Sequence, residues 1–212
     1  MSDIRLKAIV TGKTKYGDDS LIITTLSAEK GKIKFIQKHA LRQSKRKFPA
    51  VDLFREIECF YTNKPKNELQ QLRQAELLVA HDSIAQKASH YRAALKITDF
   101  LNRNTVTEHD YPHLYKTLLN VLDRLANETV DCLSSQTATV YLSMLYENGS
   151  LPDLSLSPDK EKRMLKLLAY GSKQSQKPEY DKAQWQRLER WLIQFMFDTG
   201  FNVSKEISDL SD

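Results

Sequence analysis

Cysteine is scarce in this chain, and the few cysteines that occur are widely spaced. The 212 residues include two, Cys59 and Cys132, with no Cys-x-x-Cys pair. This usage argues against a disulfide scaffold and against a cysteine-based zinc site, and it is typical of proteins of the reducing cytoplasm. We therefore expect a cytoplasmic protein that folds without a bound metal.

Long apolar runs are also absent. No stretch approaches the roughly 18 consecutive apolar residues that a membrane-spanning helix needs. The opening residues, Met-Ser-Asp-Ile-Arg, lack the pattern of a signal peptide. A hydrophobic fraction of 41% and a charged fraction of 28% are those of a soluble globular protein, so we expect no membrane segment.

Acidic residues are missing from one stretch, because none occurs between Glu29 and Asp52. Within it, Ile33 and Phe35 alternate with lysines, which predicts a half-buried strand with a charged outer face. From residue 40 to residue 47 the alternation stops and the positive charge continues, which predicts a basic loop. The stretch carries eight basic residues: Lys30, Lys32, Lys34, Lys38, Arg42, Lys45, Arg46 and Lys47. Such a pattern suits a phosphate backbone, although charge alone is compatible with an ordinary solvated face.

The charge is distributed unevenly along the chain. Residues 1–80 hold 16 Lys and Arg against 9 Asp and Glu, a balance of +7, and residues 81–212 hold 16 against 18, a balance of −2. The basic character is thus local, and we expect an anionic partner to meet the N-terminal part.

Short strands with turns between them fill the first 80 residues. Five such segments in so short a span predict a small closed barrel, and the five-stranded OB-fold is the common nucleic-acid-binding barrel of this kind. The predicted strands are residues 4–11, 21–26, the basic strand after Gly31, 51–62 and 68–78.

The apolar spacing becomes helical after residue 80. Five segments with a period near 3.6 follow, and the last should end near Gly200. The prediction is an α+β protein in two domains: an N-terminal OB-fold β-barrel for nucleic acid (residues 1–80) and an all-helical domain (residues 81–212).

Groups that could carry out catalysis are not clustered in the sequence. The carboxylates are scattered singly, and Pro112 separates His109 from His113, the one histidine pair with metal-like spacing. We therefore predict no enzymatic activity, no cofactor and no metal. Tyr16 and Phe48 are rings that could stack on bases or simply pack against the protein.

Several of these segments together resemble the RecO family of bacterial recombination mediators. In the N-terminal OB domain of that family, a Tyr-Gly-acid turn precedes a β-branched strand, a Gly-basic-Ile strand, a basic loop and a Glu-Ala-Glu-Leu-type segment. The matching residues here are Tyr16-Gly17-Asp18, residues 21–26, Gly31-Lys32-Ile33, residues 44–48 and Gln74-Ala75-Glu76-Leu77. A weaker likeness continues through residues 141–154 and 190–210.

The resemblance implies a mediator of DNA repair and recombination that is not an enzyme. It would bind single- and double-stranded DNA, anneal strands, and act with RecR and the single-stranded-DNA-binding protein to load the recombinase, in the nucleoid-associated cytoplasm. One departure is that the four-cysteine zinc motif of many members is missing after Pro152-Asp153-Leu154. In the basic loop, His39 and Pro49 stand where glycine is usual in the family. The rival interpretation is a non-catalytic OB-fold adaptor for acidic protein partners or RNA.

Two sets of residues are predicted to form sites. The nucleic-acid set adds four cations of the first strand, which share one parity, to the basic stretch: Arg5, Lys7, Lys13, Lys15, Lys30, Lys32, Lys34, Lys38, Arg42, Lys45, Arg46 and Lys47. The second set lies beside apolar residues of two helical segments, where the acidic, apolar-ended tail of the single-stranded-DNA-binding protein would bind. It comprises Lys162, Arg163, Lys166, Arg187 and Arg190.

Overall fold

A computed structural model describes residues 3–38, 40, 50–62, 69–128, 130 and 132–203 of the chain. The chain forms two compact units, and each is assembled from separate stretches of sequence. The first combines Met1–Asp82 with Leu101–Tyr115, and the second combines Ser83–Phe100 with Lys116–Asp212. The predicted division into domains of residues 1–80 and 81–212 stays a proposal. The two compact units divide the chain differently, because residues 101–115 belong to the unit that contains the barrel.

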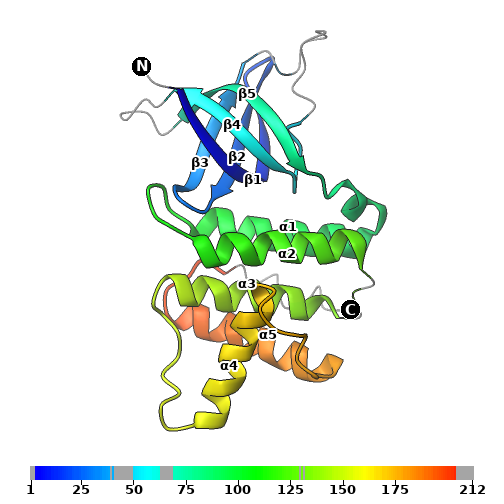
Figure 1. Cartoon of the computed structure of the whole chain (residues 1–212), viewed down its shortest axis with the longest axis vertical. Coiled ribbons are helices and arrows are strands. Elements are labelled where there is room, and N and C mark those ends of the chain that lie inside the picture. The colour runs from blue at the N-terminus through cyan, green and yellow to red at the C-terminus, as the bar shows by residue number, and fades with distance from the viewer. Residues whose placement is uncertain are drawn as a thin grey trace. The chain divides into compact units, whose positions relative to one another are not determined.

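The first unit is a closed barrel of five strands in the order β1-β2-β3-β5-β4 (Figure 1). Every neighbouring pair is antiparallel except β3 and β5, which run parallel. The strands are β1 (Asp3–Tyr16), β2 (Ser20–Ser27), β3 (Gly31–Gln37), β4 (Glu56–Thr62) and β5 (Leu69–Val79). This barrel, followed by helices, confirms the predicted α+β fold with an N-terminal OB-fold.

Alternating side chains fill the barrel. On β3, Ile33 and Phe35 are buried and Lys34 is exposed, which confirms the half-buried basic strand. Phe35 meets Tyr61 edge-on, with ring centroids 5.1 Å apart. Burial raises the pKa of the core Cys59 thiol to about 12. The buried core is Leu6, Ala8, Val10, Ile23, Ile33, Phe35, Ala50, Val51, Ile57, Cys59, Tyr61 and Leu72.

The fourth strand begins later than the sequence pattern predicts. The pattern places its start at residue 51, whereas β4 starts at Glu56. Phe54 has a left-handed φ of 66°, which interrupts extended backbone, and its N–H donates to the Val10 carbonyl at 2.9 Å. The segment before β4 is therefore a turn that packs against β1, and the predicted start is wrong.

A segment far along the chain, Leu101–Tyr115, completes the barrel unit, and we call it the strap. Its backbone follows the β2–β3 turn: Lys32 N–H donates to Val106 O, Glu108 N–H to Lys30 O, and Tyr111 N–H to Ala28 O, at 2.8–3.0 Å. Gly31 permits this approach, because its φ is +63° and a Cβ there would lie 2.3 Å from the Val106 oxygen.

The strap also covers part of the outer barrel surface. Ile9, Leu26 and Glu56 belong to one row across β1, β2 and β4 that faces away from the barrel core, yet all three are buried. The Tyr115 hydroxyl donates to Glu56 Oε1 at 2.6 Å, which satisfies that carboxylate oxygen. The barrel thus has a second buried layer on this side.

The second unit is helical. The helical elements are a 3₁₀ turn η1 (Asp82–Gln86) and the helices α1 (Ala88–Asn104), α2 (Pro112–Asn127), α3 (Leu133–Glu147), α4 (Pro158–Gly171) and α5 (Lys182–Asp198). The end of α1 from residue 101 and the start of α2 up to residue 115 belong to the strap. Residues 134–145 of α3 are buried without interruption, so α3 is the central helix. Asp181 caps α5 in a reciprocal pair with Gln184. The helical period after residue 80 and the helix end near Gly200 are both confirmed.

We expect Tyr115→Phe to lower the free energy of unfolding by about 1–3 kcal/mol, because a buried carboxylate oxygen would lose its hydrogen-bond donor. Urea unfolding of the whole chain measures this. Tyr16→Phe is the matched control, since Tyr16 is 53% exposed, and its midpoint should equal that of the wild type. Equal midpoints for both variants would show that the Tyr115 hydroxyl contributes nothing to the strap.

Candidate nucleic-acid interface

The basic strand β3 and the adjacent Lys38 include both free and internally bonded lysines. Lys34 and Lys38 are exposed, and neither has an ion-pair partner among the residues that the structure describes. The Lys32 ammonium donates to the Asn102 carbonyl of the strap at 2.8 Å. Partial burial, followed by the charge of Lys34, lowers the pKa of Lys32. Lys34 and Lys38 are therefore available to an anion, whereas Lys32 has an internal role.

Other predicted cations pair with acids of the same unit. Arg5 Nε lies 2.6 Å from Glu58 Oε1, and Lys30 Nζ lies 2.9 Å from Glu108 Oε2. The hydrogen bond to Glu108, reinforced by its charge, raises the pKa of Lys30. The Lys30–Glu108 pair is exposed on both sides, and such pairs are weak and screened by salt, whereas the Glu58 side chain is only 5% exposed. Both pairs reduce the local positive potential.

Lys13 and Lys15 do not share a face with Arg5 and Lys7, contrary to the sequence prediction. The β1–β2 register passes from Val10↔Thr25 to Gly12↔Thr24, which leaves Thr11 as an extra residue in a β-bulge. Directly opposite residues point to the same side of a sheet, and an extra residue reverses the side of all that follow. The second half of β1 therefore follows the parity of Ile23 and Leu21, the residues opposite Lys13 and Lys15.

Lys15 and the neighbouring Tyr16 are exposed at the end of the β1–β2 hairpin. Lys15 pairs with Leu21, which pairs with Gln37, so about two strand spacings, roughly 10 Å, separate the Lys15 backbone from the end of β3. Tyr16, Lys34 and Lys38 share the outer side of the sheet, whereas Lys15 at the hairpin end follows Leu21 to the other side; we call these four exposed residues the open basic end. It combines cations with one accessible aromatic ring, whereas Lys7 is exposed on β1 opposite the acid Glu58.

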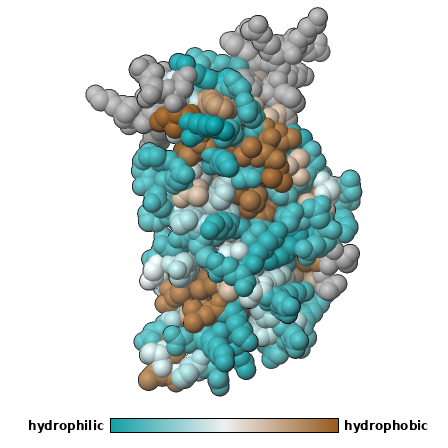
Figure 2. Space-filling view, in the orientation of Figure 1, coloured by the Kyte–Doolittle hydropathy of each residue, from teal (hydrophilic) through white to brown (hydrophobic). Residues whose placement is uncertain are grey.

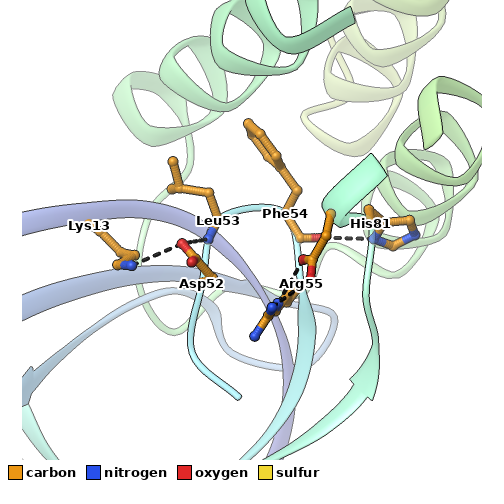
Figure 3. A network of polar contacts seen from close by, with 7 residues as sticks. Lys13, Asp52, Leu53, Phe54, Arg55 and His81 are labelled. Atoms are coloured by element: carbon orange, nitrogen blue, oxygen red, sulfur yellow. Dashed lines mark hydrogen bonds and ion pairs between the residues drawn. The ribbon is translucent and has the colours of Figure 1, made fainter. Parts of the chain in front are cut away.

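A polar network holds the chain just after the predicted basic loop (Figure 3). Lys13 Nζ donates to Asp52 Oδ1 at 2.9 Å, and the Leu53 N–H donates to the same oxygen at 2.8 Å. Burial acts to raise the pKa of Asp52, but these hydrogen bonds outweigh it and leave the pKa below its usual range. Lys13 therefore anchors residues 52–53 to β1.

Two further contacts in Figure 3 continue this anchor to the residues after β5. Arg55 Nε and Nη2 donate to the two carboxylate oxygens of Asp82 at 2.8 and 2.6 Å. The buried His81 Nδ1 lies 2.6 Å from the Phe54 carbonyl. These residues hold the turn that precedes β4. Sequence reasoning missed this network because the bonded partners lie up to 39 positions apart.

Part of the predicted interface lies outside the described residues. Apart from Ala40, the predicted basic loop (residues 40–47) and the neighbouring Phe48 lie outside the described residues. Its four cations stay predictions from the sequence: Arg42, Lys45, Arg46 and Lys47.

An apolar cavity of about 310 Å³ opens in the helical unit. Its lining is largely aliphatic and aromatic, with two cations: Leu142, Leu154, Lys160, Arg163, Met164, Leu167, Tyr180, Leu188 and Trp191. Trp191, 45% exposed, stacks on Phe195 with ring centroids 5.6 Å apart.

One of the predicted partner-binding cations, Arg163, lines this cavity, and Lys160, which was not predicted, lines it as well. Lys162, Lys166, Arg187 and Arg190 are exposed but are not among its lining residues. Sequence reasoning missed Lys160 because it precedes the apolar run of α4 by four residues, one helical turn.

The surface in Figure 2 is mainly hydrophilic, with apolar patches on both units. Exposed apolar residues include Leu77, Leu78 and Val79 on β5 and Leu165 and Trp191 on the helices. Among the described residues, no helix is long and apolar enough to cross a membrane. Within the same part of the chain, no three His, Cys, Asp or Glu side chains gather where they could hold a metal ion.

The region that forms the barrel is similar in sequence to known proteins. Residues 1–80 match the family described as Recombination protein O N terminal. The DNA repair protein RecO of Pelobacter propionicus is 32% identical over 122 residues, which are 57% of this chain and 49% of that protein. The DNA repair protein RecO of Bifidobacterium longum is 30% identical over 132 residues, 61% of this chain and 54% of that protein.

A third relative, the DNA repair protein RecO of Desulfatibacillum aliphaticivorans, is 26% identical over 132 residues, 62% of this chain and 51% of that protein. The chain thus spans about half the length of the curated relatives that it matches. The matched region contains the five-stranded barrel, and the aligned lengths exceed it. Through its N-terminal barrel, the chain is similar to proteins of the RecO family.

Proposed function

We propose that this protein is a non-enzymatic DNA-binding protein of DNA repair and recombination. The observation that carries the proposal is the open basic end, where Lys15, Lys34 and Lys38 are exposed without an acidic partner among the described residues. The relatives' shared name, DNA repair protein RecO, supports the same role.

The proposed mode of binding is independent of sequence. Lysines neutralise backbone phosphates and release counterions, which makes affinity depend strongly on salt. Tyr16 adds a ring on which a base of a single strand can stack, an interaction of about 1–3 kcal/mol in single-strand binders. We propose binding to single- and double-stranded DNA, with the stacking contribution favouring single strands.

The family resemblance extends this proposal beyond binding. The protein would anneal complementary strands and work with RecR and the single-stranded-DNA-binding protein to load the recombinase, in the nucleoid-associated cytoplasm. The alternative is an OB-fold adaptor that uses the same lysines to bind an acidic protein or RNA. A salt series with single-stranded DNA, double-stranded DNA, RNA and an acidic peptide separates these possibilities.

For DNA binding, we expect Lys34→Ala with Lys38→Ala to weaken single-strand binding and to flatten the slope of log K against log salt by about 1.4, at about 0.7 for each lost phosphate contact. Fluorescence anisotropy with labelled oligothymidylate measures this. Lys30→Ala with Lys32→Ala is the matched control: it removes the same charge from the same strand, but from lysines bonded to the strap. Equal flattening by the two pairs would contradict the assignment to the open basic end.

We further propose that the cavity of the helical unit binds an acidic peptide that ends in an apolar residue, such as the tail of the single-stranded-DNA-binding protein. Met164, Leu167 and Leu188 offer apolar area for the terminal side chain. Lys160 and Arg163 supply positive charge for the carboxylates of the peptide, and an arginine can bind a carboxylate through two parallel hydrogen bonds. The geometry favours these two cations over Arg187 and Arg190.

For this cavity, we expect Arg163→Glu to weaken binding of an acidic, phenylalanine-ended peptide at least about tenfold, or about 1.4 kcal/mol. Trp191 provides the readout, because it is 45% exposed in the cavity wall, whereas Trp185, the second tryptophan, is 1% exposed. Arg187→Glu is the control, since it makes the same charge reversal outside the cavity lining. Equal loss in the two variants would mean that the peptide responds to overall charge and not to this cavity.

A further inference from the structure

The strap pairs with the chain where β3 begins. Gly31 forms a bridge with Thr107, and hydrogen bonds of 2.9–3.0 Å join Lys32 N–H to Val106 O and Glu108 N–H to Lys30 O. The strap therefore bonds to the first two lysines of the basic stretch, whereas Lys34 and Lys38 have no bond to it among the described residues.

Glu108 is fixed against Lys30 by both backbone and side chain. Its N–H is bonded to the Lys30 carbonyl, and its φ of 57° lies in the left-handed region that residues other than glycine seldom adopt. Its Oε2 lies 2.9 Å from Lys30 Nζ. The charge of Asp110 acts on Lys30 in the same sense. A carboxylate thus occupies the position where a phosphate would meet this lysine.

We propose that Glu108 is an internal counter-ion that closes the strap end of β3 to phosphate and so confines nucleic acid to the open basic end. This inference rests on the DNA binding proposed above. A phosphate that approaches Lys30 would have to displace a carboxylate held by its own backbone, and it would meet the charge of Asp110 as well. The adjacent Lys32 is closed in another way, because its ammonium is bonded to the Asn102 carbonyl.

The consequence is a division of a strand that is uniformly basic in sequence. Lys30 and Lys32 face strap residues, and Lys34 and Lys38 face solvent. Glu108 thereby sets where the nucleic-acid path along β3 stops. It determines the length of the binding site and not the base sequence that the site prefers. Removal of the Glu108 carboxylate should let the protein contact one more phosphate.

The test is Glu108→Gln in the full chain, titrated with labelled oligothymidylate over a salt series. We expect binding about two- to fivefold tighter at low salt and a slope of log K against log salt steeper by about 0.7, because Lys30 gains a phosphate contact. Glu108→Ala should give the same gain, and thermal unfolding checks that both variants are folded. The Glu108 side chain is 67% exposed, so neither substitution opens a cavity.

Two controls make the result specific. Glu29→Gln removes the same charge from an exposed residue next to Lys30 that is not its ion-pair partner, and it should leave the slope unchanged. Lys30→Ala added to Glu108→Gln should cancel the gain. The proposal is overturned if Glu108→Gln behaves like Glu29→Gln, or if the gain persists without Lys30. Absence of binding by the wild type would instead refute the proposed function.

Discussion

The packing of the strap on the barrel is the constraint on which the rest of the unit depends. It joins residues far apart in sequence, through backbone hydrogen bonds to the β2–β3 turn and through the Tyr115–Glu56 contact, whose residues are 59 positions apart. A carboxylate as buried as Glu56 is stable only with a hydrogen-bond donor, and the strap supplies it. Ile9 and Leu26, in the same row as Glu56, are also buried on the side of the sheet away from the core. The barrel surface is thus divided into a covered part and an open part.

Because of that division, the two ends of the basic strand differ in what their lysines contact. Charge alone makes the eight cations of residues 30–48 equivalent, whereas the fold separates lysines that are bonded to the strap from lysines that are free. The anchor of Lys13, Asp52, Arg55 and Asp82 (Figure 3) adds a second distinction, because it uses a predicted phosphate ligand to hold the turn before β4. Cations in a small basic barrel therefore have either structural or binding roles, and internal acids determine which.

Much of this fold could be predicted from the sequence because its signals are local. The alternation of Ile33 and Phe35 with lysines, and the 3.6 period after residue 80, depend only on neighbouring residues. The β-bulge at Thr11 and the strap could not, because each depends on partners distant in sequence. Thr11 is an example: its hydroxyl donates to the Asn102 side chain at 2.7 Å, a residue 91 positions away. Because of the bulge, Lys13 and Lys15 lie on the other side of the sheet from Arg5 and Lys7. The alternation of the strand alone predicts all four on the same side.

The central claim is that DNA binds the open basic end while the strap end stays closed. Lysine modification with and without oligothymidylate, followed by mass spectrometry, tests it most directly, because it reports each ammonium separately. The account predicts strong protection of Lys15, Lys34 and Lys38, and unchanged modification of Lys30 and of Lys87 and Lys116 in the helical unit. Protection that is greatest at Lys30, or that falls on the helical unit alone, would contradict it.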